Sequence, residues 1–455
     1  MQDFISVILA AGMGKRMKSE MPKVMHKVCG KALCEWVIDA SKNAGASKVV
    51  AIIGHKAEVV KPQIEDKAEI AYQTEQLGTG HAVMQAADFI KNCTGHVVIL
   101  NGDTPLVTGE TIKAAIEYHE ELGNAATVIT AILDDSTGYG RIVRNSAGDV
   151  VKIVEQKDAN ADEIDIKEVN SGMYVFNAKD LIYALDKITP NNAQGEYYLT
   201  DTLEILIKMG QKVGAYSIDD NDEIRGINDK IQLSEANEIM QMRINKKHMA
   251  NGVTMIHPET VSIEDTVEIG QDTVIEQNVI LKGDTKIGSN TVIGANSQIV
   301  NSVIHDNVNV MCSVITDSEV DSETNVGPFA YIRPNSKVGK HVKVGDFVEL
   351  KNAAIGDGTK ISHLTYVGDA IVGKNVNFGC GTVTVNYDGK NKYTTVIGDN
   401  AFIGCNTNLV SPVNVNKNAY IAAGSTITDE VPENSLAIAR SRQVIKNEWN
   451  DKRSK

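Results

Sequence analysis

In the first half of the chain, short apolar runs alternate with longer amphipathic stretches. The apolar runs cover residues 4–9, 48–53, 97–100 and 126–132, and the amphipathic stretches include 33–44 and 80–91. This alternation predicts βαβ units around a mostly parallel sheet, which is a Rossmann-like α/β domain. Ligands of such sheets bind beyond the carboxyl ends of the strands, so we expect a ligand site there.

Residues 229–250 contain helix-forming residues throughout and no Gly or Pro. The apolar positions Ile231, Leu233, Ala236, Ile239 and Met240 fall near one helical face. We therefore predict a connecting helix between two domains.

From about residue 252 the hydrophobic period changes to six. The aliphatic runs are Ile263, Ile269, Ile275, Leu281, Ile287, Ile293 and Ile299, then Val326, Ile332, Val338, Val344 and Leu350, then Ile397, Ile403, Leu409, Val415, Ile421 and Ile427. An α-helix does not give a period of six, and an ordinary strand gives two. The pattern indicates a parallel β-helix, in which each six-residue side carries one aliphatic residue into a narrow core and small residues, often Gly, turn the corners.

The repeat has two kinds of interruption. Its register slips by one residue between Leu350 and Ile355 and between Val367 and Val372, and the polar segment 384–397 carries a turn-forming Asp388-Gly389. We predict that this segment is a loop outside the coils. The expected domains are 1–228, a linker helix at 229–250, the β-helix at 251–437, and a basic tail at 438–455.

Composition narrows the possible functions. The net charge of −14 argues against a nucleic-acid partner, although a local cluster of cations still permits small anionic substrates. No run of 18 apolar residues occurs, and the N-terminus lacks the basic start of a signal peptide, so we expect no membrane span and a cytoplasmic location. The six scattered cysteines contain no CxxC pair and favour reduced thiols over a zinc site.

The first chemical motif follows the first apolar run. It reads Leu9-Ala10-Ala11-Gly12-Met13-Gly14-Lys15-Arg16-Met17, with Lys23 a few residues later. Glycines let a backbone approach a phosphate or base, and Arg16 and Lys23 can neutralise phosphate charge. The segment is neither a Walker loop nor a full GxGxxG motif, and an ordinary β-to-α turn is the alternative interpretation.

Two further turns strengthen the prediction of a nucleotide site. Gln76 to Gly80 form a second polar turn, and the apolar run 97–100 ends in Asn101-Gly102-Asp103. An Asp at the carboxyl end of a central strand can hold Mg²⁺ against a nucleotide phosphate, although it can also simply cap a turn.

A second site is expected in the later coils of the β-helix. Arg333 and Lys351 are 18 residues apart, which is three sides of six, so they should stack on one edge about 5 Å apart. His363 and Tyr366 lie close by in the sequence and could supply a base for acyl transfer. Solvated surface charges and a structural histidine are the alternatives.

The motifs LAAGxGxRM and Pro22-Lys23 resemble those of sugar-nucleotide pyrophosphorylases. Over about residues 3–442 the chain resembles the bacterial family that combines N-acetylglucosamine-1-phosphate uridyltransferase and glucosamine-1-phosphate acetyltransferase. The resemblance implies a left-handed β-helix, a homotrimer with acetyl sites between subunits, and UTP and acetyl-CoA as co-substrates.

The resemblance also implies roles for individual residues. The nucleotide and sugar would contact Leu9, Ala10, Ala11, Gly12, Lys23, Gln73, Gly78, Thr79, Asn101, Gly102, Gly140, Glu155 and Asn170, with Mg²⁺ on Asp103 and Asn228. Glucosamine 1-phosphate would bind Arg333, Lys351, Tyr366 and Asn377, with His363 as general base. Acetyl-CoA would bind Cys380, Asn386, Tyr387, Cys405, Ala423 and Arg440.

Three positions depart from common forms of the family. Asn101 stands where an aromatic residue can occur, and Cys380 and Cys405 replace small Ala and Ser residues. We therefore expect the acetyl site to be sensitive to thiol reagents.

These observations favour a bifunctional enzyme that acetylates glucosamine 1-phosphate and then transfers UMP to the product. One alternative is a nucleotidyltransferase whose β-helix only regulates or scaffolds. A non-enzymatic nucleotide sensor on an assembly scaffold is another, but the joint presence of Lys23, Asp103 and His363 argues against it.

Overall fold

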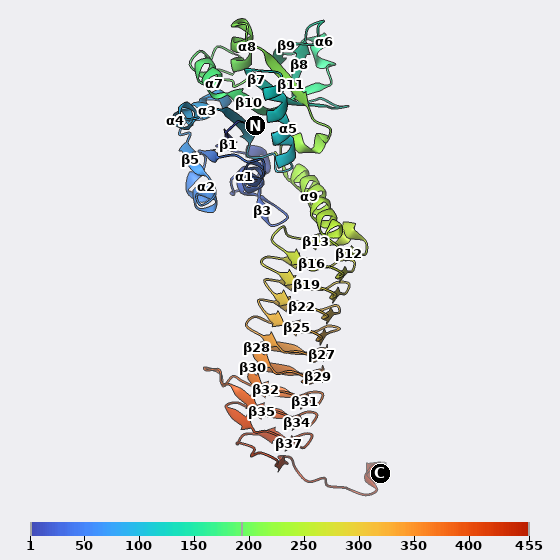
Figure 1. Cartoon of the computed structure of the whole chain (residues 1–455). Helices are drawn as coiled ribbons and strands as arrows, with labels where there is room; N and C mark the ends of the chain where they lie inside the picture. Colours follow the sequence, from blue (N-terminus) through green and yellow to red (C-terminus); the bar gives the residue numbers. More distant parts are fainter. Residues whose placement is uncertain (1, 193, 454–455) are drawn as a thin grey trace. The chain divides into compact units, whose positions relative to one another are not determined.

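The computed structural model describes residues 2–192 and 194–453. The chain forms two compact units, residues 1–240 and 241–455 (Figure 1). Within the described residues, no helix is both long and apolar enough to cross a membrane. Of the predicted basic tail, Lys455 lies outside the described residues.

The first unit is built on a mixed, mostly parallel sheet. Its main strand order is β11-β7-β10-β6-β1-β4-β5. The strands are β1 Phe4–Ala10, β4 Lys48–Ile53, β5 Glu69–Tyr72, β6 His96–Asn101, β7 Ala126–Ile132, β10 Glu168–Asn177 and β11 Val213–Ser217. β10 runs antiparallel to β6 and β7, whereas the other pairs on this path are parallel. Two hairpins complete the strands, β2 Lys27–Val28 with β3 Lys31–Ala32, and β8 Gly140–Arg144 with β9 Val150–Val154.

Helices cover both faces of this sheet. They are α1 Leu33–Asn43, α2 Ala57–Ile64, α3 Thr79–Met84, α4 Ala87–Lys91, α5 Gly109–Glu121, α6 Ala161–Ile164, α7 Ala178–Leu185 and α8 Asp201–Lys208, with 3-10 turns at Lys15–Met17, Lys23–Met25 and Asn221–Ile224. Along β1, Ile8 packs in the core cluster of α1 and α5, and its neighbour Val7 packs in that of α3, α4, α7 and α8. This alternation is the period of two expected of a strand covered on both sides.

Two helix predictions need correction. The single helix expected at 80–91 is two helices, because Ala86 leaves helical geometry with φ −94° and ψ 8°. The connecting helix is present as α9 Lys230–Ala250, but Ile231 is 72% exposed. The buried apolar positions of α9 are Ala236, Met240 and Ile244, spaced by four, and the polar Asn245 beside them is buried too. Ile231 lies on roughly the opposite side of the helix.

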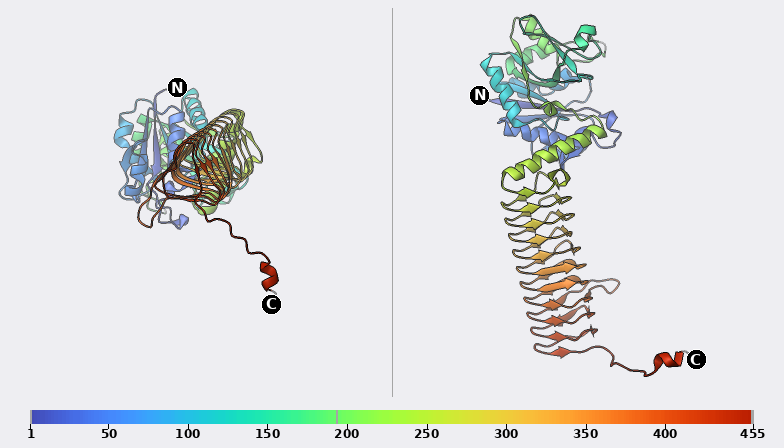
Figure 2. Two further views of the ribbon diagram at one scale, coloured as in Figure 1. Left: turned by 90° about the horizontal axis from the view of Figure 1, so that it is seen from below. Right: turned by 90° about the vertical axis from the view of Figure 1, so that its right-hand side faces the viewer.

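The second unit is a parallel β-helix whose coils stack in register (Figures 1 and 2). One face is formed by β12 Thr254–Met255, β15 Val274–Ile275, β18 Val292–Ile293, β21 Asn309–Val310, β24 Asn325–Val326, β27 Lys343–Asp346, β29 Lys360–His363, β31 Asn377–Phe378, β34 Phe402–Ile403, β37 Tyr420–Ile421 and β39 Leu436–Ala437.

The remaining strands form a continuous sheet around the other sides. They are β13 Ser262–Ile263, β14 Glu268–Ile269, β16 Ile280–Lys282, β17 Lys286–Ile287, β19 Gln298–Val300, β20 Val303–Ile304, β22 Val314–Thr316, β23 Glu319–Val320, β25 Tyr331–Ile332, β26 Lys337–Val338, β28 Glu349–Ile355, β30 Tyr366–Val372, β32 Val383–Val385, β33 Thr395–Ile397, β35 Asn408–Val410, β36 Val413–Val415 and β38 Thr426–Ile427. A 3-10 turn at Pro258–Thr260 and the helix α10 Trp449–Arg453 are the remaining elements.

The period-six aliphatic residues form the core of this unit. With the exception of the half-buried Ile269, every one of them is buried. The corners differ from the expectation of small residues, because many left-handed positions are Asn, as at Asn278, Asn296 and Asn400. Asn tolerates a positive φ better than most residues. The Gly after an aliphatic residue serves close approach instead, since a Cβ on Gly288 would lie 2.7 Å from a backbone atom of the next coil.

Both predicted interruptions are present. Glu349 pairs with Tyr366 and Ala354 with Lys337, each 17 residues apart, so the register slips by one. The strands β28 and β30 run through these slips with Asn352 and Asp369 at positive φ. The polar segment leaves the coils between β32 and β33 as a protruding loop (Figure 2), and Tyr387 and Lys392 form a bridge across it.

Candidate active sites

The turn after β1 fixes the position of Lys23. Gly14 has φ +58°, and a Cβ at this residue would lie 2.5 Å from the Cβ of Lys23. Only glycine fits so close an approach in that conformation. Met17, which stands where a dinucleotide motif would have its third glycine, is buried and anchors the turn in the core.

The Lys23 ammonium lies between two predicted metal ligands. Its Nζ donates to Asp103 Oδ2 and lies 3.2 Å from Asn228 Oδ1, and Arg16 donates to the same amide oxygen at 2.8 Å. A Cβ built on Gly226 would lie 3.8 Å from both Asp103 carboxylate oxygens and 3.7 Å from Asn228 Nδ2, so the two side chains converge. A cation therefore already sits where the two oxygen ligands meet.

A cavity of ≈ 260 Å³ opens beyond the carboxyl ends of the central strands. Its lining includes the predicted residues Leu9, Ala11, Gly12, Lys23, Gln73, Gly78, Thr79, Asn101 and Asp103. The structure thus brings nine of the predicted nucleotide residues around one space. Gln76 of the predicted polar turn lines it too, and Val24, Ala82 and Glu196 are lining residues that the sequence analysis missed.

The turn at Gly78 is held by a distant segment. Gly78 has φ +111°, and a Cβ there would lie 2.5 Å from the Tyr197 carbonyl oxygen. Gly80 N donates to that carbonyl at 2.8 Å, and Leu199 N donates to Thr79 Oγ1 at 3.1 Å. Gln73, buried, donates to the Gly78 carbonyl at 3.2 Å. The backbone around Thr79 is therefore fixed in place before any ligand binds.

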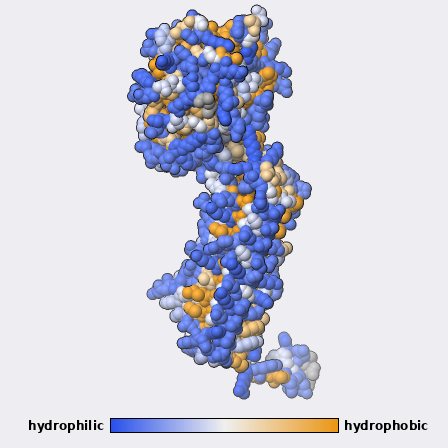
Figure 3. Space-filling model, viewed as in Figure 1, coloured by the Kyte–Doolittle hydropathy of each residue, from blue (hydrophilic) through white to orange (hydrophobic). Residues whose placement is uncertain are grey.

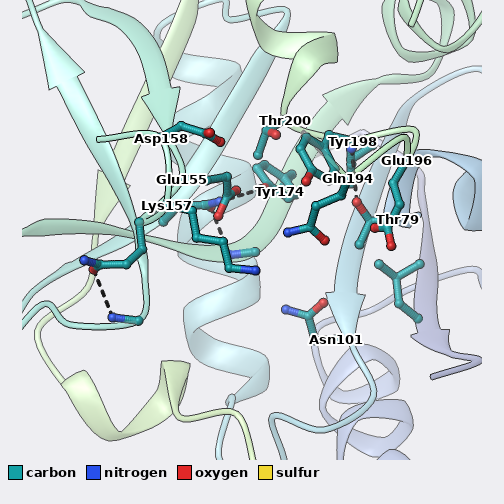
Figure 4. A pocket seen from close by; sticks show the side chains of 16 residues that line it. Thr79, Asn101, Glu155, Lys157, Asp158, Tyr174, Gln194, Glu196, Tyr198 and Thr200 are labelled. Carbon is teal, nitrogen blue, oxygen red and sulfur yellow. Dashed lines mark hydrogen bonds between the residues drawn. The ribbon is translucent and has the colours of Figure 1, made fainter. Parts of the chain in front are cut away.

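An adjoining cavity of ≈ 340 Å³ shares Leu9, Thr79, Asn101 and Glu196 with the first. It adds the predicted Glu155 and Asn170 (Figure 4). Asn170 donates to the Tyr174 hydroxyl at 2.9 Å. Burial, with Asp158 and Asp201 nearby, raises the pKa of Glu155. The side chains of Asp158, Gln194, Tyr198 and Thr200 surround the same space (Figure 4) and were not singled out in the sequence, because they come from loops without a recognisable spacing.

Three predicted residues support this site without lining either cavity. Ala10 is buried at the end of β1, and Gly102 N donates to the Leu9 carbonyl at 2.9 Å. Gly140 pairs with Asn170 across the β8–β10 ladder, and a Cβ on it would lie 3.5 Å from the Asn170 Cβ. These three residues hold the backbone and the neighbouring side chains in place. None of them lines either cavity, so the predicted ligand contacts of these three residues are not seen.

In the β-helix, His363 ends β29 and is exposed. Its Nδ1 lies 2.7 Å from Asp346 Oδ1 in the preceding coil. The hydrogen bond from the imidazole lowers the pKa of the Asp346 carboxyl. The Nδ1 atom of His363 is thus hydrogen-bonded to the Asp346 carboxylate, and Nε2 is not.

The predicted stack of Arg333 and Lys351 is present. Tyr331 pairs with Glu349 and Ile332 with Leu350, which places Lys351 in register with Arg333. Arg333 also forms an ion pair of 2.7 Å with Glu349, and Glu349 in turn pairs with Tyr366. The two cations and the tyrosine therefore share one edge of neighbouring coils.

Lys392 in the protruding loop is a further cation at this edge. Its interaction with Lys351 lowers the pKa of the Lys351 ammonium, with smaller contributions from burial and from Arg333. Each positive charge disfavours the charged form of its neighbour, and a doubly charged anion bound between them would relieve that repulsion. Lys392 was missed because the loop places it, not the six-residue spacing.

The base of the loop is anchored by Asp369. Its carboxylate accepts hydrogen bonds from Asn352, at 2.6 Å, and from Asn386. Asn386 is buried, whereas the neighbouring Tyr387 is exposed and donates to the Gly389 carbonyl at 2.7 Å. The two predicted acetyl-CoA residues of the loop therefore differ, since only Tyr387 is open to solvent.

The other predicted acetyl-CoA residues lie in one column with His363. Phe378 pairs with Ile403 and Ile403 with Ile421, so Cys380, Cys405 and Ala423 stack in successive coils below His363. Arg440 lies at the next corner, with its Cδ 3.8 Å from a Cβ built on Gly424. Asn377 is on the same face, paired with Lys360 and Phe402.

The two groups of β-helix residues flank one corner. Leu364, with φ +41°, separates His363 on one side from Tyr366 on the other. Within the described chain, the structure gives no direct contact between the cationic edge at Arg333 and the column at His363. A ligand or a second chain would have to span the corner.

Family models match most of the chain. The nucleotidyl transferase model matches residues 5–229, and the bacterial transferase hexapeptide (six repeats) model matches 266–301 and 394–429. The model of the GMPPB C-terminal domain matches 314–389. The predicted α/β domain and hexapeptide β-helix are thereby confirmed.

Curated relatives align over nearly the whole chain. The bifunctional protein GlmU of Acetivibrio thermocellus is 59% identical over 99% of this chain and 97% of its own length. GlmU of Caldanaerobacter subterraneus is 55% identical over 100% and 99%, and that of Clostridioides difficile 54% over 99% and 98%. A solved UDP-glucose pyrophosphorylase complexed with UDP-glucose covers 53% of the chain at 16% identity and a TM-score of 0.44.

Proposed function

Because the chain belongs to the GlmU family of bifunctional proteins, we propose that its two candidate sites divide the two reactions between the two compact units. The enzyme is a bifunctional transferase that acetylates glucosamine 1-phosphate and transfers UMP from UTP to the N-acetylated product. On our proposal residues 1–228 hold the uridyltransferase and residues 251–437 the acetyltransferase. The observation that carries this division is that Lys23 with Asp103, and His363 with Asp346, lie in different units.

Uridyl transfer is chiefly a problem of charge. The sugar phosphate is largely dianionic near neutral pH, since its second pKa is about 6, and it must attack another anion. Lys23 and Arg16 would hold the phosphates by charge and hydrogen bonds, while the backbone at Gly12 and Gly78 admits the nucleotide closely. Asn170 and Glu155 in the adjoining cavity would contact the acetylated sugar.

The donor set near Lys23 suits Mg²⁺. Mg²⁺ prefers oxygen ligands and usually keeps waters and substrate phosphates beside one or two protein groups. Asp103 and Asn228 supply such oxygens at one point, where the Lys23 ammonium already marks a cation position. No cluster of three His, Cys, Asp or Glu in the described part of the chain offers a closed site. Asp103 and Asn228 would hold Mg²⁺, whose charge would offset that of the phosphates, and Lys23 would supply a second positive charge beside it.

Acetyl transfer needs a base. As the amino group of glucosamine 1-phosphate attacks the thioester, the C–N bond forms, the C–S bond breaks and coenzyme A leaves as its thiol. His363 would accept the proton that the amine loses and return it to the leaving sulfur. Arg333, Lys351 and Lys392 would bind the phosphate, with Tyr366 and Asn377 beside the sugar. The column of Cys380, Cys405 and Ala423, with Tyr387 and Arg440, would bind acetyl-CoA.

We further propose that the β-helix trimerises through its exposed apolar corner. Phe329, Phe347 and Leu364 stack in successive coils, each more than half exposed and each at positive φ. The two phenyl rings are stacked at 5.5 Å and 13°. Bulky residues in that conformation cost free energy, and a buried interface would offset it. Apolar side chains gather at several places on the visible face of the β-helix (Figure 3).

The division of labour is tested by assaying each half-reaction in full-length variants. Asp103→Ala should lose uridyltransferase activity by a factor of 10² or more and keep acetyltransferase activity, and His363→Ala should do the reverse. His341→Ala is the matched control, because His341 also pairs with a carboxylate in the β-helix but lies outside the site. Loss of both activities in folded His363→Ala protein contradicts the two-site proposal.

The single-function alternative predicts a different outcome. If the β-helix only regulated or scaffolded the first unit, wild-type protein would show no acetyl transfer, and His363→Ala would be silent in both assays.

A further inference from the structure

We propose that Asp346 is a positioning residue of the acetyltransferase, holding the proton and the ring orientation of His363 so that Nε2 faces the substrate amine as the base. The inference rests on the proposed role of His363 and adds a second residue to it. Asp346 is not among the residues for which the family motifs predict a role.

The β-helix register creates this pair. Asp346 ends β27 and His363 ends β29, and the two residues are direct partners in the parallel ladder. The pairing is locked by the Leu364 N–H, which donates to the Asp346 carbonyl at 2.9 Å. Gly345 lets the coils approach, since a Cβ there would lie 2.0 Å from the Ser362 carbonyl oxygen. The carboxylate and imidazole are thus brought together by rigid backbone.

The chemistry of the pair fixes the tautomer. An ionised carboxylate can only accept hydrogen bonds, so at 2.7 Å the His363 Nδ1 must carry the hydrogen. The hydrogen bond also keeps the Asp346 carboxyl ionised, because it lowers the pKa of that group. Nε2 then retains its lone pair, which is what a general base requires. Without Asp346 the other tautomer would compete and the ring could rotate.

Among the charged groups near His363, Asp346 is the carboxylate that pairs with its ring. Of the nearby ionisable groups, Lys343 lies on β27, Lys360 on β29 and Cys380 after β31, while beyond the corner Glu349 is committed to Arg333. Asp346 therefore stabilises the imidazolium that forms when His363 takes the proton.

The test is acetyl transfer by full-length Asp346→Ala and Asp346→Asn across a range of pH. We expect kcat to fall by about tenfold in the Ala variant, with KM for both substrates within about twofold. The Asn variant keeps an acceptor oxygen without the charge and should fall in between. The acid limb of the pH profile should move to lower pH in both variants, because removing the anion disfavours the protonated ring.

Three comparisons make the result decisive. Glu323→Gln removes the carboxylate partner of His341, 3.1 Å away, and should leave kcat and the pH limb unchanged. Uridyltransferase activity of each variant reports intact folding. An unchanged kcat and pH limb in Asp346→Ala, with His363→Ala inactive, would overturn the positioning role alone, whereas an active His363→Ala would overturn the proposed base itself.

Discussion

At the scale of single residues, backbone conformations place the reactive groups. Gly14 accepts a positive φ and a 2.5 Å approach to Lys23, and Gly345 lets Asp346 meet His363. In each case a missing Cβ lets two chain segments come close enough for a charged side chain to reach its partner. The side chains of Lys23 and Asp346 are placed by these close backbone approaches.

The two cysteines Cys380 and Cys405 lie next to each other in adjacent coils of the β-helix. Cys380 and Cys405 are partners in adjacent coils, bracketed by backbone hydrogen bonds of 2.7 Å from Gly379 to Ile403 and from Asn406 to Cys380. Their Cα atoms are therefore about one strand spacing apart, roughly 4.8 Å. Both are free thiols, and Cys405 is exposed.

We predict that alkylation of these thiols by N-ethylmaleimide abolishes acetyl transfer and spares uridyl transfer. Cys405 should react first, because it is exposed, and Cys34 should resist, because burial raises its pKa to about 12. Peptide mass spectrometry with parallel assays of both reactions provides the measurement. A Cys380→Ala, Cys405→Ser variant should stay active after treatment, and full acetyltransferase activity in modified wild type would refute the prediction.

At the scale of elements, a buried histidine ties a helix to two strands. His119 on α5 is 1% exposed, with Nδ1 2.9 Å from Thr127 Oγ1 on β7 and Nε2 3.1 Å from Asn177 Oδ1 on β10. Burial is the main cause that lowers its pKa to about 4, with His96 adding to the effect and Asn177, Glu120 and Asp180 opposing it. The imidazole of His119 therefore joins α5 to the sheet in its neutral form, and protonation of the ring would disfavour this packing.

This packing predicts acid sensitivity of the first unit. In the unfolded chain the pKa of His119 returns to about 6.5, so below that pH the unfolded state takes up a proton that the folded state refuses. Stability from this group is complete above pH 6.5 and is lost as the pH falls toward 4, by roughly 3 kcal/mol in all.

Urea unfolding of a full-length Trp449→Phe protein, in which Trp36 is the remaining tryptophan, measures the effect by fluorescence at several pH values. His119→Gln should flatten the dependence between pH 6.5 and 4, whereas the exposed His341→Gln should not. An identical pH dependence in wild type and His119→Gln would show that other groups dominate.

At the scale of the whole molecule, the two groups of residues proposed for acetyl transfer lie on different sides of one corner of the β-helix. The cationic edge and the His363 column lie on either side of the corner at Leu364, and the stacked Phe329 and Phe347 form an apolar strip along it. Trimerisation through this strip would bury it and bring residues of another subunit to the site.

We predict that Phe329→Glu with Phe347→Glu converts a trimer to monomers. Acetyl transfer should fall at least tenfold and uridyl transfer should persist, since burying two charges at an interface is costly. Light scattering after gel filtration gives the mass, and Ile132→Glu, at an equally exposed apolar residue of the first unit, is the control. Monomeric wild type with full acetyltransferase activity would contradict the proposal.

Sequence by itself determined the elements and most of the candidate chemistry. The short continuous apolar runs predicted the sheet strands, because a strand covered by helices on both faces is apolar at successive positions. The period of six predicted the coils, because one residue of each six-residue side enters the core. It also placed Arg333 over Lys351, since that contact depends only on an unbroken repeat.

Only the tertiary structure decided the contacts between distant segments. Lys23 meets Asp103 and Asn228 across 80 and 205 residues, and Lys392 reaches Lys351 from a loop. The register of 17 that joins Asp346 to His363 follows from the slip between Leu350 and Ile355 in the sequence, but the hydrogen bond between the two side chains is visible only in the structure. The structure also shows that Ile231 is exposed and that the predicted helix at 80–91 is interrupted at Ala86. Local periodicity records which side of an element is buried, whereas the contacts of Lys23 and of Lys392 depend on the paths of loops between distant segments, which no local pattern encodes.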